Sequence, residues 1–357
     1  MKKNLRNILA VGLGLITTVA FAQDWGVDSR TRIDMSGDND RMETQQRATI
    51  SATWGGSDWG IHSSSDVNYD LTNGVATVDV YEAYASTDLM GYANLTVGRQ
   101  AWDYGSGLIM GSNQWGGTAS NGGTDRTTRD GMTFGLNLDM ADVTVLYASR
   151  TNGEVDATGA SFWGVNASKS EGDWTANLLY GSQSMTTLGV DADDFTAMGL
   201  DLGYTVSGVD LSLSYNTTDD GTTEGDMMMI GASYNVNDDM AIHGSRTTYG
   251  ENGFAMTGSN YGVGASSWLS HGNMGYLAAN DERMSFGGTY NMGSISLGAT
   301  MHNVTNTENS NYDRSATEIS LGYDLNDNAG LSLNMATDND GGADDVNYMW
   351  ITLNVTP

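Results

Sequence analysis

Arginines that share one face of an extended chain are the first residues in this sequence that could do chemistry. Arg30 and Arg32 lie two positions apart, out of phase with the apolar Val27 and Ile33, and Arg47 is likewise out of phase with its apolar neighbours. Because successive side chains of a strand point to opposite faces, these guanidinium groups fall on the polar faces of their strands. Arginines that face carboxylates across water set up a transverse field, which orients polar solutes and sorts ions.

The other candidates are charged residues at or near predicted strand ends. We expect them to line a water-filled passage, because an arginine facing lipid at mid-depth costs roughly 2–4 kcal/mol. A salt-bridged lining without selectivity would produce the same pattern, and both interpretations stay open. Arg99 shares the phase of Leu95 and Val97, so an inward Arg99 requires a bulge or a position beyond the lipid band. The predicted pore-lining residues are Arg30, Arg32, Arg47, Glu82, Arg99, Asp103, Arg129, Asp130, Arg150, Arg283 and Arg314.

The sequence lacks the motifs of common enzymes. It contains no GxSxG, no HExxH and no P-loop, and it contains no cysteine for a disulfide or a thiolate-ligated metal. Its histidines do not have the spacing of metal ligands. They are His62, His243, His271 and His302. We therefore expect no enzyme, no metal site and no cofactor.

Composition narrows the class of protein further. The chain has 357 residues, with 15 Lys+Arg against 44 Asp+Glu and a formal net charge of -29. A nucleic-acid-binding protein needs a basic face, so this charge argues against that function. The mean hydropathy of -0.34 argues against a multi-helix membrane protein. Forty-seven glycines beside one proline fit strands closed by tight turns.

The first 22 residues read as a secretory signal peptide. Lys2, Lys3 and Arg6 precede the apolar run 8–21, and Ala20-Phe21-Ala22 has the small-x-small pattern of a cleavage site. The run is too short for a spanning helix, although an uncleaved anchor is the alternative. We expect residues 1–22 to be removed and residues 23–357 to form one domain.

Alternation of apolar and polar residues dominates that domain. Segments such as 209–216 and 295–302 alternate strictly, which predicts half-buried strands. Eighteen such segments can be placed, and sixteen is possible within the error of their boundaries. A soluble sandwich would alternate in the same way. The connections favour an antiparallel transmembrane β-barrel, because very short turns alternate with longer polar loops. Such a barrel has short periplasmic turns, long extracellular loops and aromatic girdles at both interfaces.

Two long loops, 105–128 and 250–282, are candidates to fold into a wide barrel. The first carries the predicted constriction residues Leu108, Ile109, Met110 and Trp115, whose apolar side chains need burial. An external cap or an oligomer contact is the alternative. The remaining loops carry acidic clusters such as 191–194 and 338–345, which could hold divalent cations or simply be solvated. Their charge predicts a mild cation preference.

One segment resembles a known family. Residues 97–105 read VGRQAWDYG, followed by GLIMGSNQW at 107–115 and RDG at 129–131. This pattern resembles the alginate-export family of outer-membrane barrels, and the likeness implies a porin-like barrel for passive diffusion. General porins imply a homotrimer, whereas the alginate-export relative implies a monomer.

We therefore expect a porin-like channel in the outer membrane, which passes small polar or charged solutes with a mild cation preference. Its expected partners are the outer-membrane lipids and those solutes or ions. The alternative is a secreted or surface-anchored acidic β-rich adhesin without a conducting pore.

Overall fold

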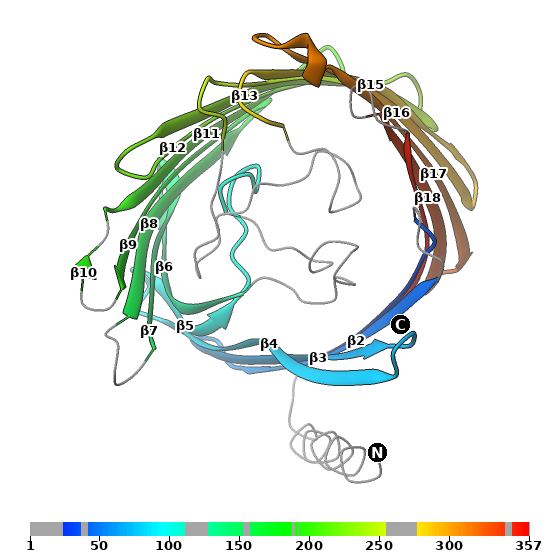
Figure 1. Cartoon of the computed structure of the whole chain (residues 1–357). Helices are drawn as coiled ribbons and strands as arrows, with labels where there is room; N and C mark the ends of the chain where they lie inside the picture. Colours follow the sequence, from blue (N-terminus) through cyan, green and yellow to red (C-terminus); the bar gives the residue numbers. More distant parts are fainter. Residues whose placement is uncertain are drawn as a thin grey trace.

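The chain forms a closed antiparallel β-barrel. The computed structural model describes residues 24–36, 42–110, 128–152, 158–187, 190–191, 193–254, 277–339 and 345–356. They contain one sheet, in which each strand pairs antiparallel with its neighbours and the first strand pairs with the last (Figure 1). β10 (Val190–Asp191) pairs only with β9, so the closed ring has eighteen strands and the prediction of eighteen is confirmed.

The strands of the ring follow the alternating segments of the sequence. They are β1 (Asp24–Asp34), β2 (Glu43–Gly55), β3 (Trp59–Asp70), β4 (Val75–Asp88), β5 (Asn94–Gln100), β6 (Arg129–Leu138), β7 (Ala141–Asn152), β8 (Thr158–Glu171), β9 (Trp174–Thr187), β11 (Phe195–Val206), β12 (Val209–Asp219), β13 (Glu224–Asn235), β14 (Met240–Tyr249), β15 (Asp281–Met292), β16 (Ile295–Asn306), β17 (Arg314–Asn326), β18 (Ala329–Asn339) and β19 (Val346–Val355). A short 3-10 helix (Ser310–Tyr312) lies between β16 and β17.

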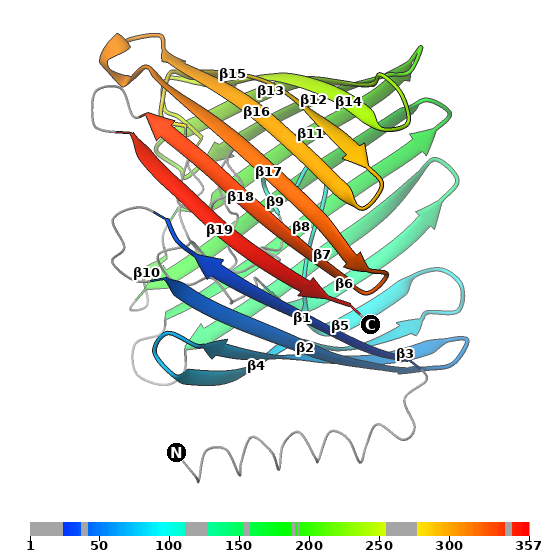
Figure 2. The same cartoon turned by 90° about the vertical axis from the view of Figure 1, so that its right-hand side faces the viewer.

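The two ends of the barrel differ in their connections. Short turns such as 207–208 and 293–294 lie at one end, where β1 begins and β19 ends, and the longer connections lie at the other (Figure 2). We call these the turn end and the loop end. Two loop-end connections, 71–74 and 220–223, are tighter than predicted. Asp70, directly before the first turn, and Asp220, at the start of the second, each accept hydrogen bonds from the backbone N–H groups two and three residues later, which makes each connection short.

The polarity of the two faces is the reverse of a soluble protein. Large apolar side chains stand exposed on the outer face, among them Phe286 and Met301, each 66 % exposed. Polar side chains are buried on the inner face, such as Asn216 at 1 % and Asp66 at 3 %. This arrangement suits lipid outside and water or polar groups inside. Among the described residues, no helix is long and apolar enough to cross a membrane.

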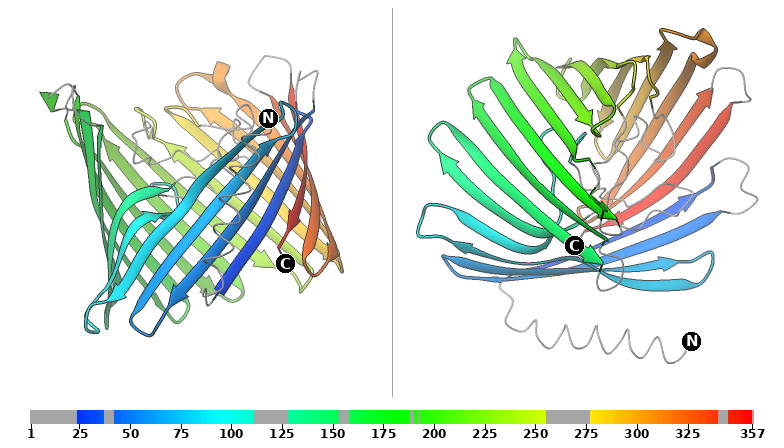
Figure 3. Two further views of the ribbon diagram at one scale, coloured as in Figure 1. Left: turned by 90° about the horizontal axis from the view of Figure 1, so that it is seen from below. Right: turned by 60° about the vertical axis from the view of Figure 1, so that its left-hand side comes forward.

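The main apolar cluster lies inside the barrel. It joins inward-facing side chains of the wall, including Leu146, Phe162 and Leu179, to residues of the connection after β5. In Figure 1 this connection turns into the ring, and Figure 3 shows the tilted strands that surround it.

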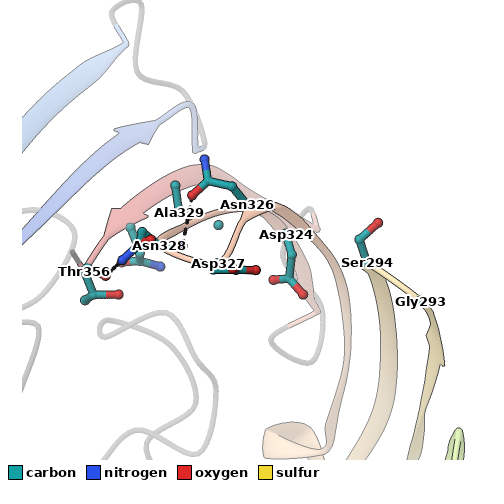
Figure 4. A pocket seen from close by; sticks show the side chains of 10 residues that line it. Gly293, Ser294, Asp324, Asn326, Asp327, Asn328, Ala329 and Thr356 are labelled. Atoms are coloured by element: carbon teal, nitrogen blue, oxygen red, sulfur yellow. Dashed lines mark hydrogen bonds between the residues drawn. The ribbon is translucent and has the colours of Figure 1, made fainter.

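The turn end holds a small polar hollow between the β15–β16 and β17–β18 turns and the end of β19 (Figure 4). There Asn328 donates its backbone N–H to Asn326 Oδ1 at 2.9 Å and its side-chain amide to the carbonyl of Thr356 at 3.1 Å. These bonds fasten the last described residues to the neighbouring turn.

Candidate functional site in the barrel lumen

The connection after β5 enters the lumen directly. The carboxylate of Glu82 accepts a hydrogen bond from the backbone N–H of Ala101 at 3.0 Å, at the point where the chain leaves the wall. The chain then doubles back, and Tyr104 N–H donates to the carbonyl of Met110 at 3.0 Å. Residues 101–110, which we call the inner loop, therefore form a compact bend inside the ring (Figure 1).

Apolar side chains hold the inner loop against the wall. Trp102, Ile109 and Met110 are between 0 and 3 % exposed and belong to the cluster with Phe162 and Leu179. Leu108 and Tyr104 are partly buried against the same cluster. Burying a side chain of this size stabilises by about 1.5–3 kcal/mol, so the packing gives the loop a fixed position.

Polar contacts fix the tip of the inner loop. Ser106 N–H donates to Asp201 Oδ2 at 2.8 Å, and the Ser106 hydroxyl lies 3.3 Å from that of Ser214, which in turn donates to Asp201. Gly105 has a φ of +61°, and a Cβ there would collide with Asp201 and Asn177. A glycine is therefore required for the tip to approach the wall of β11 and β12.

The structure places three of the four predicted constriction residues in this loop. Leu108, Ile109 and Met110 lie inside the barrel, while Trp115 lies outside the described residues. Of the predicted second loop, 250–282, residues 250–254 and 277–282 are described, and Asp281 and Glu282 already belong to β15. Phe254 at its start packs edge-on against Tyr249, with ring centroids 5.9 Å apart, and joins the same inner cluster.

The segment 98–100 has a structural role that sequence reasoning did not see. Gly98 has a φ of +135°, and its missing Cβ leaves room for the backbone of Ala83 on β4. Gln100 points inward, where its amide donates to the carbonyls of Gly98 and Gly131 and accepts from Thr133. These bonds lie at the last residue of β5, directly before the inner loop begins.

Arg99 and Asp130 do not line the lumen, and their assignment as pore-lining residues was wrong. Arg99 pairs in register with Ala83 and Asp130, on the same face as the exposed Val97. Its Nε and Nη2 donate to Asp130 Oδ1 and Oδ2 at 2.7 and 2.8 Å, on the outer surface. A carboxylate partner on the adjacent strand makes the outward position tolerable, and the phase shared with Val97 was the signal that pointed to it.

Three of the predicted arginines form a group on the first two strands. Arg30 and Arg47 are direct register partners on the inner face, and the guanidinium of Arg32 lies 5.4 Å from the ring centroid of Trp350. Arg47 and Trp350 are each 2 % exposed, so they are enclosed within the barrel. β1 and β2 lie nearly opposite β9 and β11 in the ring, where the inner loop is fastened.

The remaining predicted residues are spread around the wall. Arg129 is 2 % exposed and lies within electrostatic reach of Asp103 in the inner loop. Arg283 donates to the hydroxyl of Thr247 at 3.0 Å, and Arg314 lies inward at the start of β17. Arg150 pairs with Ala160 in the β7–β8 register.

Two polar ladders, in each of which a hydroxyl, a histidine and a glutamate lie on successive strands, could not be assembled from the sequence. In one, His302 Nδ1 is 2.8 Å from the Ser285 hydroxyl and Nε2 is 3.3 Å from Glu318. In the other, His62 is 2.9 Å from the Thr53 hydroxyl and 3.7 Å from Glu82. The residues are far apart in sequence, and only the strand register brings them together.

Within the described residues, no group of three or more acidic or histidine side chains has the geometry of a metal site. Each ladder holds two ionisable groups, a histidine and a glutamate.

Comparisons with known proteins agree on the fold. No family model matches the sequence, and no curated protein matches it. The structure is similar to Pseudomonas aeruginosa OccK5 (OpdH), with a TM-score of 0.69 and 12 % identity over 94 % of this chain and 98 % of that one. It is similar to OpdK of the same organism, with a TM-score of 0.69 and 10 % identity over 94 % and 99 %. OprD gives a TM-score of 0.63 and 14 % identity over 94 % of each chain.

These matches settle the architecture and correct the resemblance drawn from the sequence. The neighbours are OccK and OprD outer-membrane proteins, and the likeness to the alginate-export family is not supported. The short motif on which it depended is explained by the end of β5 and by the Arg99–Asp130 pair. The fold is a closed eighteen-stranded antiparallel β-barrel, similar to those of the OccK and OprD outer-membrane proteins.

Proposed function

We propose that the chain is an outer-membrane channel through which small polar or charged solutes diffuse passively. The observation that carries the proposal is the inner loop, fastened to one side of a polar lumen by Ser106 and Asp201. A barrel with this many strands is wide enough for an aqueous passage, and an inward loop narrows it.

The lumen wall carries charges of both signs. Arg30, Arg32 and Arg47 form a basic group on β1 and β2, with the carboxylates of Asp28 and Asp34 among them, while Asp103 and Asp201 lie at the inner loop and its anchor on the other side. A passage between them crosses a transverse field, which orients dipolar and charged solutes as they enter. This arrangement supports selection among polar solutes.

Carboxylates support the proposed cation preference. Asp28, Asp66, Asp79, Asp210 and Glu318 all take inward positions in the strand register, and the whole chain is strongly acidic. Such a wall raises the local cation concentration.

Planar-bilayer recording of the refolded protein under a salt gradient tests the channel. Stable current steps with a reversal potential of the cation-selective sign are expected. Anion-selective reversal would refute the cation preference alone. Folded, inserted protein that gives no steps would refute the channel and favour a structural barrel.

We further propose that residues 1–22 are a signal peptide that directs the chain to the outer membrane. Fractionation of cells that express the full chain is expected to recover it in the outer membrane with an intact mass that begins at Gln23. A chain that keeps Met1 would refute the cleavage.

A further inference from the structure

A second ion pair stands on the outer face of the barrel. Arg246 on β14 donates from Nε and Nη2 to the two carboxylate oxygens of Glu282 on β15, at 2.8 and 2.6 Å. Arg246 is in register with the outward-facing Ile230 and Met284, so the pair belongs to the outer surface. Its side chain is 49 % exposed.

The pair lies at the loop-end border of the apolar outer face. Across neighbouring strands, Arg246 is paired with Met284, Met284 with Asn303, and Asn303 with Ser315. Asn303 and Ser315 are polar and face outward. Toward the turn end, the outward positions become Phe286, Met301 and other apolar side chains. The guanidinium therefore sits where acyl chains give way to lipid headgroups.

An apolar hollow opens directly beneath Arg246. It measures about 730 Å³. Its floor is formed by Ala232 and Gly244, and its sides are formed by Leu211, Ile230, Phe286 and Met301. Gly244 creates the depression, because a larger side chain at this outward position would stand between Ala232 and Phe286, its register partners.

The two arginine–carboxylate pairs of the outer face differ in one respect that matters for binding. In the Arg99–Asp130 pair, the remaining amine Nη1 donates to the carbonyl of Val80 at 3.3 Å. In the Arg246–Glu282 pair, Nη1 has no hydrogen-bond partner among the described residues. Arg246 thus presents an open cationic donor edge above the apolar hollow.

We propose that this hollow and Arg246 bind one phosphate-bearing lipid, with an acyl chain in the hollow and a phosphate oxygen on Arg246 Nη1. Guanidinium suits this ligand because it keeps one edge for Glu282 and offers another to the phosphate. The inference goes beyond the proposed channel and requires only that the outer face stands in a bilayer.

Native mass spectrometry of the detergent-solubilised full-length barrel tests the proposal. Phosphatidic acid and the diacylglycerol with the same acyl chains are titrated against it, so the two probes differ in the phosphate alone. We expect one phosphatidic acid per barrel, bound at least about tenfold more tightly than diacylglycerol. Equal binding of the two lipids would overturn the proposal.

Variants separate the two parts of the site. R246M with E282Q removes the donor and leaves no unpaired charge, and it should reduce phosphatidic acid binding to the level of diacylglycerol. G244L fills the hollow and should weaken both lipids. The matched control is R99M with D130N, which removes the other outer pair and should leave binding unchanged.

Three results contradict the proposal. The control variant could lose as much binding as R246M with E282Q, which would indicate nonspecific attraction. Phosphatidic acid could bind equally well to every variant, which would indicate an adventitious additive only. Barrel dimers or trimers that G244L dissociates would indicate that a second copy of the chain occupies the hollow. Heat-modifiable migration in gels establishes that each variant is folded.

Discussion

Ser106 and Asp201 are joined by a 2.8 Å hydrogen bond from the backbone N–H of one to the carboxylate of the other, although 95 positions separate them in sequence. The bond ties the tip of the inner loop to β11, and the hydroxyl of Ser214 braces the same carboxylate. A bond to a charged acceptor contributes about 1.5–3 kcal/mol, which makes this the strongest single polar anchor of the loop tip.

Replacement of Asp201 by asparagine should loosen the inner loop. The amide keeps the shape of the side chain and loses the charge, so the anchor weakens by about 1–2 kcal/mol. Single-channel recordings should then show a larger mean conductance and more current noise than the wild type. D210N is the matched control, since Asp210 bonds Thr205 near the turn end and does not touch the loop. Unchanged conductance in D201N would mean that the loop does not narrow the passage.

Replacement of Ile109 by alanine should destabilise the packing of the same loop. Ile109 is 3 % exposed, and removing a buried side chain of this size costs about 2–5 kcal/mol. Hydrogen–deuterium exchange of residues 101–110 should accelerate, while exchange in the strands stays slow. I61A, at an outward position that is 48 % exposed, should leave exchange in the loop unaltered. Equal protection in I109A and wild type would contradict the packing role.

Tyr104 gives the inner loop a dependence on alkaline pH. Burial raises the pKa of Tyr104 to about 12, and the neighbouring Asp103 adds to the shift. The pKa of a free tyrosine is about 10, so the folded loop disfavours the phenolate. The stability that Tyr104 contributes is full below about pH 10 and is lost as the pH rises through about 12.

Ultraviolet titration of tyrosinate measures this shift. The difference between wild type and Y104F should show one phenol with a midpoint near pH 12. A difference midpoint near 10, the value of an exposed phenol, would show that Tyr104 is not held in the packed loop.

The outer pair Arg99–Asp130 should matter for stability rather than for transport. D130N leaves a guanidinium without its carboxylate near the border of the lipid band, where the cost is about 1 kcal/mol. Urea unfolding in phospholipid vesicles should show that loss for D130N and a smaller one for R99M with D130N, which removes both charges. A change of ion selectivity in D130N would show that Asp130 faces the lumen, which would contradict the outward position given by the strand register.

The alternation of the sequence was sufficient to predict the wall of the barrel, because each strand carries its own inside–outside pattern. Strand number, antiparallel order and the alternation of short and long connections all follow from local residues such as those of 209–216. The alternation also placed Arg47 on the inner face, and it indicated that Arg99 shares the outward face of Val97.

Contacts between distant strands could not be predicted in the same way. The link between Ser106 and Asp201 and the ladder of Ser285, His302 and Glu318 depend on which strands are neighbours and on their exact register. Arg246 Nη1 has no hydrogen-bond partner among the described residues, whereas Arg99 Nη1 donates to Val80. Residue spacing in the sequence could not predict this difference. Loop residues such as Leu108 could be recognised as needing burial, but the partners that bury them lie on β7 to β13.

The seam between β1 and β19 has a consequence for the order of assembly. Six register pairs, from Ser29 with Val355 to Asp34 with Trp350, join the two ends of the chain, whereas β1 and β2 share eleven. Every other neighbouring pair in the ring is consecutive, so hairpins can form as the chain becomes available. The seam must wait for the final strand, and loop-closure entropy makes such long-range pairing slow. Until then both β1 and β19 are unprotected edges, which makes the unclosed sheet the species most prone to aggregate during biogenesis.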